Sequence, residues 1–187
     1  MPKLHILIAS TRPTRIGPAV AAWFEGQAKT HTGFDVELVD LASFGLPLLD
    51  EPEHPMKQLY QHDHTKKWAA KVSEADAFIF ILPEYDYFTP ASLVNAIQAL
   101  SKEWNYKPVG MVSYGGLSAG LRSAQMTKLL ATSVKMMPMA ETVAVPFVGK
   151  RLDDNGEFTS DEMLDASATK LLDELLRWTR AMKVLRS

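Results

Sequence analysis

Apolar runs alternate with segments of helical periodicity along the whole chain, and this alternation constrains the fold more than any other feature of the sequence. Strands are predicted at residues 4–9, 34–41, 77–82, 108–113 and 141–145. Helices are predicted after each of them, at about residues 17–29, 68–75, 90–104, 120–134 and 162–182. A strand–helix order repeated in this way predicts an α/β fold with a parallel, doubly wound sheet and helices on both of its faces.

Two kinds of local pattern refine this outline. Residues 77–82 form an unbroken apolar run, which is typical of a central parallel strand buried on both faces. Thr89 and Pro90 are predicted to be the N-cap and first-turn residue of the third helix, whose apolar stripe reaches Trp104. Thr159 and Glu162 are predicted to form a capping box at the start of the last helix.

Size and composition exclude several classes of protein. The 187 residues suffice for one α/β domain with a full core, and the sequence has neither repeat nor linker, so a single domain over residues 1–187 is predicted. A net charge of -2 gives no basis for nonspecific binding to nucleic acid or to anionic membranes. The absence of cysteine excludes disulfides, thiolate–zinc sites and a cysteine-nucleophile phosphatase, which would share the opening strand, loop and helix.

The sequence also bears on location and metal binding. It has no apolar run of membrane-spanning length and no long apolar core of a signal peptide, so we expect a cytoplasmic protein. The five histidines show no repeated ligand spacing, and no metal site is predicted. His62 and His64, on either side of Asp63, are expected to be solvated loop residues.

The loop after the first strand carries hydroxyls and positive charge and leads into a helix. Ser10, Thr11 and Thr14 offer hydroxyl donors, and Arg12 and Arg15 offer guanidinium groups that match phosphate oxygens. The N–H groups of the helix N-terminus favour an anion as well. On these residues alone two interpretations stay open: a phosphate site, or a capped strand-to-helix turn with two solvated arginines.

The loops after the third and fourth strands carry different side chains. Tyr85, Tyr87 and Phe88 follow the third strand, and Gly115 and Gly116 follow the fourth. Because ligands of open parallel sheets bind at the carboxyl ends of the strands, we expect all three loops to gather there. The aromatic residues could anchor their loop on the core, but three in four positions favour a ligand or dimer surface. Glycines let a flat ligand approach the backbone, and FMN fits better than ATP because no Gly-x-x-x-x-Gly-Lys motif is present.

The three loops resemble motifs of the NADPH-dependent FMN reductase family, which includes quinone, azo- and chromate-type reductases. Ser10 and Arg12 match the family's first-loop Ser-x-Arg pattern. The match to Pro-Glu-Tyr-Asn and the Pro-x-x-Leu-Lys-Asn-Ala helix start comprises Pro83, Glu84, Tyr85, Pro90, Leu93, Asn95 and Ala96. The match to Ser-Tyr-Gly-Gly-x-x-x-Gly comprises Ser113, Tyr114, Gly115, Gly116 and Gly120. One such motif is weak evidence, whereas three in order at the predicted strand ends are specific.

The resemblance implies a flavodoxin-like fold with five strands in the order 2-1-3-4-5, FMN as cofactor and NADPH or NADH as co-substrate. It implies that the first loop holds the FMN phosphate and that the other two loops border the isoalloxazine ring. The ring would lie exposed at the interface of a homodimer, which could assemble further into a homotetramer. The implied FMN-binding residues are Ser10, Thr11, Arg12, Arg15, Ile16, Gly17, Pro83, Glu84, Tyr85, Asp86, Tyr87, Ser113, Tyr114, Gly115 and Gly116.

The sequence departs from the family's pattern in two loops. Asp86 stands where the family has Asn, Tyr87 and Phe88 stand where small residues are usual, and Ala9 replaces a glycine. A carboxylate that points toward the ring would disfavour the reduced anionic flavin and lower its potential. Tyr87 and Phe88 would narrow the slot or form a lid that faces a partner.

The resemblance implies an oxidoreductase whose cofactor carries the hydride chemistry, so no catalytic side chain is predicted. NADPH would donate a hydride to flavin N5 and leave, and a quinone, azo compound, metal oxyanion or free flavin would then enter the same slot. The alternatives are a flavodoxin-type electron carrier, for which a net charge of -2 is too weakly acidic, and a non-catalytic FMN-binding redox sensor. Arg15 could meet the FMN phosphate, the 2′-phosphate of NADPH or solvent.

Overall fold

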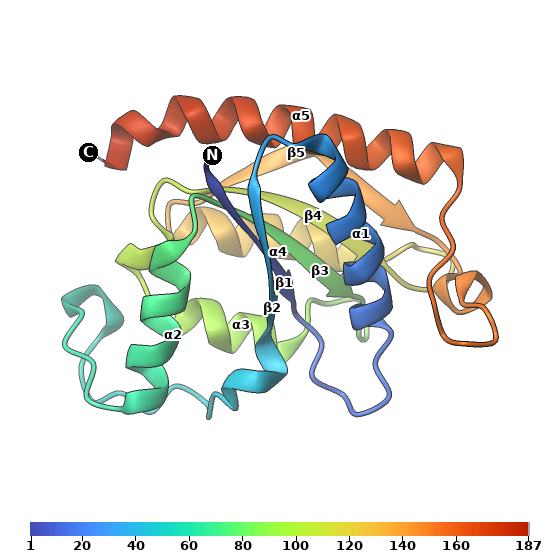
Figure 1. Cartoon of the computed structure of the whole chain (residues 1–187). Helices are drawn as coiled ribbons and strands as arrows, with labels where there is room; N and C mark the ends of the chain where they lie inside the picture. The colour runs from blue at the N-terminus through green and yellow to red at the C-terminus, as the bar shows by residue number, and fades with distance from the viewer. Residues whose placement is uncertain (187) are drawn as a thin grey trace.

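The computed structural model describes residues 1–186 and contains a five-stranded sheet whose neighbouring strands are all parallel (Figure 1). The strands are β1 (Lys3–Ile8), β2 (Asp35–Asp40), β3 (Ala77–Pro83), β4 (Pro108–Tyr114) and β5 (Met137–Val145). Their order across the sheet is β2-β1-β3-β4-β5, which confirms the predicted α/β class and the flavodoxin-like order. Ser187, the last residue of the predicted single domain, lies outside the described residues.

Helices cover both faces of the sheet (Figure 1). One face packs against α1 (Gly17–His31) and α5 (Glu162–Met182), and the other against α2 (Asp63–Glu74), α3 (Ala91–Gln98) and α4 (Leu121–Ser133). Each face has its own apolar core, with Phe24 and Leu171 in the first and Trp68 and Leu93 in the second. A parallel sheet that is apolar on both faces needs both layers to exclude water.

The central strand is β3, as the unbroken apolar run predicts. All of its residues are buried, and alternate side chains enter the two cores. Ile79 and Ile81 pack on the α1 and α5 side, whereas Phe78 and Phe80 pack on the other. The ring of Trp104 lies 5.1 Å from that of Phe78, centroid to centroid, so an aromatic cluster closes the second core.

The third helix differs from the prediction at both ends. It ends at Gln98, and Trp104 lies in a separate 3-10 turn. The indole of Trp104 packs against the rings of Phe78 and Phe80 under the sheet, and it reaches them from this turn without a continuous helix. The predicted N-cap is wrong as well. Pro90 occupies the N-cap position, and the buried hydroxyl of Thr89 turns to α4, where it accepts a hydrogen bond from the Thr127 hydroxyl at 2.8 Å.

The predicted capping box at the start of α5 is also wrong. Asp161 is the N-cap, and its carboxylate accepts a hydrogen bond from the N–H of Leu164 at 2.9 Å. Thr159 stays in the preceding loop, where its own N–H donates to the carbonyl of Arg151 at 2.8 Å. An acidic cap immediately before the first turn satisfies a free N–H group and matches the positive end of the helix dipole.

Two further boundaries differ from the prediction. β5 begins at Met137 rather than at Glu141. α2 begins at Asp63, so His64 lies in its first turn instead of in a loop, and its ring lies 3.0 Å from the carboxylate of Asp50. A proline-rich segment precedes this helix, and its polar first turn has no apolar stripe from which the start of the helix could be predicted.

The loops after β1, β3 and β4 leave the sheet from the carboxyl ends of adjacent strands. They are named here loop 1 (residues 9–16), loop 3 (residues 84–90) and loop 4 (residues 115–120). Direct contacts between their side chains, described below, join the three at one edge, as predicted. Within residues 1–186, no helix combines the length and the apolar character that crossing a membrane requires.

Candidate functional site

Loop 1 leaves the sheet through a buried serine. Ser10 is fully buried, and its Oγ accepts a hydrogen bond from the Tyr114 hydroxyl at 3.4 Å. A side chain at Gly17 would place its Cβ 2.4 Å from Ser10 Oγ and 2.9 Å from the Tyr114 hydroxyl oxygen. The first turn of α1 therefore requires glycine at position 17. Burial raises the pKa of Tyr114 to about 12, which keeps its hydroxyl protonated.

The first turn of α1 offers positive potential to an anion. It contains no acidic residue, and no side chain caps the N–H of Gly17. Pro18 has no N–H, and the N–H of Ala19 donates to the carbonyl of Ile16 at 3.0 Å, so Gly17 supplies the N–H that this turn offers to an anion. Thr11, Arg12 and Thr14 lie exposed just before it, and the guanidinium of Arg12 is 3.5 Å from the Thr14 hydroxyl. Arg12 has no carboxylate partner in the described part of the chain. Loop 1 thus presents N–H groups, hydroxyls and an available guanidinium together, which is the donor set that a phosphate requires.

Arg15 has a different environment from Arg12. One of its terminal nitrogens donates to the carbonyl of Ser10 at 3.1 Å, and the other pairs closely with the carboxylate of Asp40 at the end of β2. The carboxylate of Asp40 also accepts a hydrogen bond from the N–H of Ala42 at 3.0 Å. Arg15 therefore ties loop 1 to the end of β2, a structural role that none of the three sequence-based interpretations included.

The tip of loop 3 is a tight turn in an uncommon backbone conformation. Tyr85 and Phe88 exchange two backbone hydrogen bonds, of 3.1 and 2.9 Å, and enclose Asp86 and Tyr87. The φ angles of these two central residues are 49° and 68°. Two consecutive left-handed residues are typical of a type I′ turn, which favours glycine and asparagine and strains a residue such as tyrosine. The carboxylate of Asp86 is exposed at this tip, so water screens its charge.

Side chains connect loop 3 to the loops on either side of it. The guanidinium carbon of Arg12 lies 5.9 Å from the centre of the Tyr85 ring. On the other side, the carboxylate of Glu84 accepts a hydrogen bond from the Ser118 hydroxyl at 3.0 Å and pairs with Arg122, in the first turn of α4, at 2.7 Å. The side chain of Glu84 therefore turns toward loop 4 and away from loop 1.

Loop 4 owes its path to glycine. Gly120 has a φ of 75°, and a Cβ there would lie 2.7 Å from the backbone of Tyr114. The buried hydroxyl of Ser113 donates to the carbonyl of Ala119 at 2.9 Å, so it braces the loop from within. Gly116 is exposed, and a Cβ there would meet no atom within 4 Å. Open space next to bare backbone suits the edge of a planar ring.

The structure brings all the predicted site residues to this one edge, at different depths. Thr11, Arg12, Asp86, Tyr87 and Gly116 are exposed. Arg15, Ile16, Glu84, Tyr85 and Gly115 are half-buried. Ser10, Gly17, Pro83, Ser113 and Tyr114 are buried behind them. The donor set of loop 1 and the open flank of Gly116 fit a phosphate joined to a planar ring, which are the two ends of FMN.

Three residues whose side chains connect these loops are not predicted from the sequence. They are Asp40, Ser118 and Arg122, which pair with Arg15 or with Glu84. The available signal is opposite charge at a strand end or in a first helical turn. That signal is common at protein surfaces, and the sequence does not show which charges meet.

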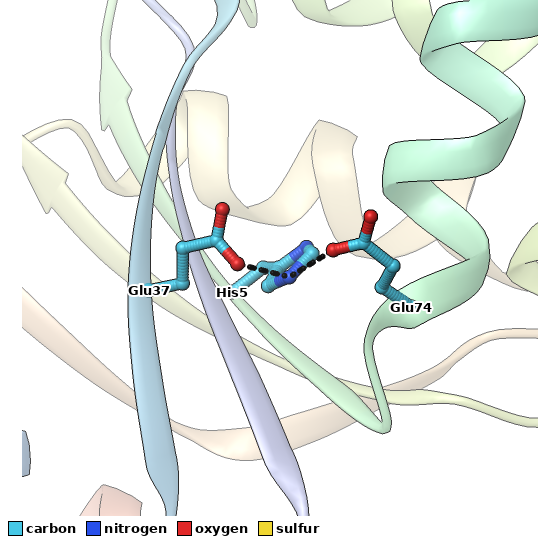
Figure 2. Close-up of side chains that lie close together, drawn as sticks. All are labelled: His5, Glu37 and Glu74. Atoms are coloured by element: carbon cyan, nitrogen blue, oxygen red, sulfur yellow. Dashed lines mark ion pairs between the residues drawn. The ribbon is translucent and has the colours of Figure 1, made fainter.

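A second cluster of ionisable groups lies away from these loops, where His5 of β1 sits between Glu37 and Glu74 (Figure 2). His5 Nε2 is 3.3 Å from Glu37 and 3.9 Å from Glu74. Both carboxylates also bind the ammonium groups of Lys3 and Lys71, at 2.8 to 3.1 Å. Two positive charges therefore balance the two negative ones, and the chain itself supplies the cations that a metal would otherwise provide.

The ionisation of this cluster follows from burial and pairing. Hydrogen bonding to Lys71 is the main cause that lowers the pKa of Glu37 to about 2. Burial lowers the pKa of His5 to about 4, so its ring stays neutral at pH 7. We assign the cluster to the stability of the sheet and α2, not to the functional site.

Comparison with known proteins places the chain among flavin-dependent reductases. The family model for NADPH-dependent FMN reductase matches residues 2–150. The chain is similar to an NAD(P)H-dependent FMN reductase of Schizosaccharomyces pombe, with 40% identity over 137 residues that cover 72% of this chain and 68% of the relative. It is also similar to one from Nectria sp., with 32% identity over 154 residues that cover 79% of this chain and 76% of the relative.

Among solved structures, the fold resembles that of FerB, a flavoenzyme NAD(P)H:(acceptor) oxidoreductase of Paracoccus denitrificans. The TM-score is 0.73 with 17% identity, and the match covers 97% of this chain and 98% of that one. At this identity the likeness concerns the fold alone. The family match extends over all three loops, and the chain belongs to the NADPH-dependent FMN reductase family.

Proposed function

We propose that this protein passes a hydride from NADPH or NADH through FMN to a quinone, azo compound, metal oxyanion or flavin, by a ping-pong mechanism in the cytoplasm. Membership of the family makes it an NAD(P)H-dependent oxidoreductase with FMN as cofactor. The proposal adds the acceptor, the order of the reactants and the residues that bind. The observation that carries it is the presence, at one sheet edge, of a phosphate-type loop and of exposed backbone at Gly116 with no atom near its Cβ position.

The exposed donors of loop 1 would hold the phosphate of FMN. Arg12 supplies charge and two N–H groups, Thr11 and Thr14 supply hydroxyls, and the first turn of α1 supplies the backbone N–H of Gly17. Arg15 and Asp40 would keep this loop in position without touching the phosphate. Because the guanidinium of Arg12 now lies over Tyr85, phosphate binding would draw it toward α1.

Loops 3 and 4 would border the ring and leave one of its faces accessible. The backbone of loop 3 supplies one edge, and exposed Gly116 supplies the other. When bound, FMN would supply the hydride chemistry: a hydride taken from NAD(P)H would pass to an acceptor together with a proton from solvent, which converts a quinone to a quinol. The chain needs no acid or base of its own for this transfer. Its part is to orient the ring and to let two flat reactants use the same face in turn.

We also propose that the protein is a homodimer, which could pair further into a tetramer. A groove of about 460 Å³ between α3 and α4 is lined mainly by apolar side chains, among them Phe88, Val94, Met126 and Leu129. Phe88 belongs to loop 3, so the groove borders one of the three loops of the candidate site. A second copy of the chain bound there would cover exposed Leu129 and shield from water the space between loops 3 and 4 where the flavin ring is proposed to lie.

Steady-state kinetics of the FMN-loaded enzyme test the mechanism. Initial rates are measured while NADPH is varied at several fixed concentrations of a naphthoquinone. A ping-pong order gives parallel lines in a double-reciprocal plot, whereas intersecting lines contradict it. A flavodoxin-type carrier or a redox sensor gives no turnover with NADPH at all, so this experiment also separates the proposal from its two alternatives.

A further inference from the structure

We propose that Arg122 is a positioning residue which, anchored by Glu84, fixes the ring of Tyr87 as an aromatic wall for the electron acceptor. The inference rests on the proposed function, because it assumes that reactants enter between loops 3 and 4. It adds a specificity-determining residue, Tyr87, and two residues that act through it. Side-chain contacts join loop 3 to the first turn of α4.

The tip of loop 3 needs external support to keep its conformation. Asp86 and Tyr87 both have positive φ, a backbone conformation that is strained for residues other than glycine. Two backbone hydrogen bonds, between Tyr85 and Phe88, close the turn. They do not fix the direction in which the whole tip leans, so side-chain contacts beyond the turn have to supply it.

Glu84 provides the fixed point for those contacts. Its side chain is only 7% exposed, so its carboxylate is shielded from water although Arg122 itself is 46% exposed. One carboxylate oxygen accepts from Ser118 at 3.0 Å and pairs with Nε of Arg122 at 2.7 Å. The other accepts from the backbone N–H of Arg122 at 3.1 Å. Glu84 thus holds both the backbone and the side chain of Arg122 and caps the N-terminus of α4.

Arg122, held in this way, stacks on the ring of Tyr87 and fixes its orientation. Its guanidinium carbon lies 3.8 Å from the centre of the Tyr87 ring, which is stacking distance. One face of the ring is covered in this way, yet the side chain is 67% exposed, which leaves the opposite face open to solvent. A tyrosine held by one face at the rim of a site offers its other face to a planar aromatic molecule.

The contacts predict how the three residues share their effect. Removing the Tyr87 ring removes the wall itself, so the affinity for a planar acceptor falls. Removing the Arg122 side chain leaves the Tyr87 ring present but no longer held in one orientation, so the affinity for a planar acceptor falls for the same reason. The two losses therefore do not add, and a variant that lacks both side chains binds the acceptor no worse than one that lacks Tyr87 alone.

The test uses the oxidative half-reaction of the FMN-loaded enzyme under argon. The flavin is reduced by light and EDTA, without NADPH, and mixed with increasing 1,4-naphthoquinone in a stopped-flow instrument. We expect Y87L and R122A each to raise the quinone concentration for half-maximal reoxidation about three- to ten-fold, with an unchanged maximal rate. Y87F keeps the ring and should match the wild type, and R122A/Y87L should match Y87L. Reoxidation of Y87L by ferricyanide, which has no ring, should be unchanged.

A second readout does not depend on activity. In the protein without ligands, hydrogen–deuterium exchange of a peptide that covers residues 84–90 should be faster in R122A than in the wild type. K67A is the matched control, because Lys67 lies over the ring of Phe44 at 5.5 Å, on α2 and outside the three loops, and it should change neither readout. Unchanged exchange in R122A, additive losses in R122A/Y87L or equal losses with both acceptors would each overturn the inference. Because NADPH is not used, failure of the proposed function leaves this result interpretable.

Discussion

The hydroxyl of Tyr114, at the end of β4, donates a hydrogen bond to Oγ of Ser10, in the loop after β1, across a distance of 3.4 Å. β3 lies between these two strands, so the contact spans the central strand of the sheet. Both side chains are buried, and both lie under the first turn of α1 at Gly17. The proposed phosphate end of the site is thus joined to the start of the loop that borders the proposed ring site.

Gly17→Ala tests this junction. Its Cβ would lie 2.4 Å from Ser10 Oγ and 2.9 Å from the Tyr114 hydroxyl, so α1 has to shift. We expect the free energy of unfolding to fall by about 1–3 kcal/mol and the affinity for FMN to fall with it. Urea denaturation and FMN fluorescence titration measure the two effects. Gly26→Ala is the matched control in the same helix, because a Cβ there meets nothing within 4 Å, and it should stabilise by about 0.5–1 kcal/mol. Equal effects of the two substitutions contradict the account.

Arg12 and Arg15 should separate phosphate binding from loop support. Arg12→Ala removes an exposed guanidinium, and we expect it to weaken FMN binding by about ten- to a hundredfold while riboflavin, which lacks the phosphate, binds unchanged. Arg15→Ala breaks the pair with Asp40 that supports the loop, so it should lower the thermal stability of the protein in addition to its affinity for FMN. Arg177→Ala removes a guanidinium from α5, where the side chain is 80% exposed, and should change neither quantity. Loss of riboflavin affinity in Arg12→Ala argues against a phosphate role for this residue.

The sequence predicts the architecture well because the fold follows from patterns that extend over many residues, so no single side chain decides them. Burial on both faces makes residues 77–82 unmistakable as a central strand, and the alternation of elements leaves little freedom in topology. The predictions fail where one local contact decides. Asp161 caps α5 although Thr159 and Glu162 match the capping-box pattern, and Thr89 turns to Thr127 across the space between two helices. The contact of Thr89 joins residues distant in sequence, which have no local pattern, whereas at α5 two possible caps stand close together and the sequence pattern does not choose between them.

The same limit applies to the candidate site. Its loops are visible in the sequence because glycine and the Pro-Glu-Tyr segment have backbone roles that local motifs retain. The role of Arg15 is not visible, because its partner Asp40 lies on a different strand. Nor does the motif reveal that Glu84 turns away from loop 1 toward Arg122, since both directions suit an acidic residue after a buried strand.

Acid should destabilise the protein through His5. Burial lowers its pKa to about 4 in the folded state, against about 6.5 in the unfolded chain, so the unfolded chain binds the proton first as the pH falls. Stability is therefore lost between about pH 6.5 and pH 4, with a slope of up to about 1.4 kcal/mol per pH unit. The carboxyl of Glu37, whose pKa is lowered to about 2, adds to the loss below about pH 4.5.

Urea unfolding at several pH values between 7 and 4 measures this slope. His5→Gln should flatten it, whatever the substitution does to stability at pH 7, because glutamine does not titrate. A slope that is the same in His5→Gln and in the wild type contradicts the assignment.

Leu129 tests the proposed dimer. It lines the groove between α3 and α4 and is 67% exposed in the single chain, so a carboxylate there would be buried without a partner in a dimer. We expect Leu129→Glu to shift the protein to monomers in sedimentation velocity experiments. Met163→Glu changes a residue of α5 that is 64% exposed, and should leave the assembly intact. A dimer that survives Leu129→Glu places the interface elsewhere.

The most direct test of the central claim is the reaction of the FMN-loaded protein with NADPH under argon, before any acceptor is added. We predict that the visible absorbance of oxidised FMN disappears on addition of one equivalent of NADPH or NADH and returns when a naphthoquinone is added. A flavin that dithionite bleaches but neither nucleotide does would contradict the account, and would leave an electron carrier or a sensor as the function of the site.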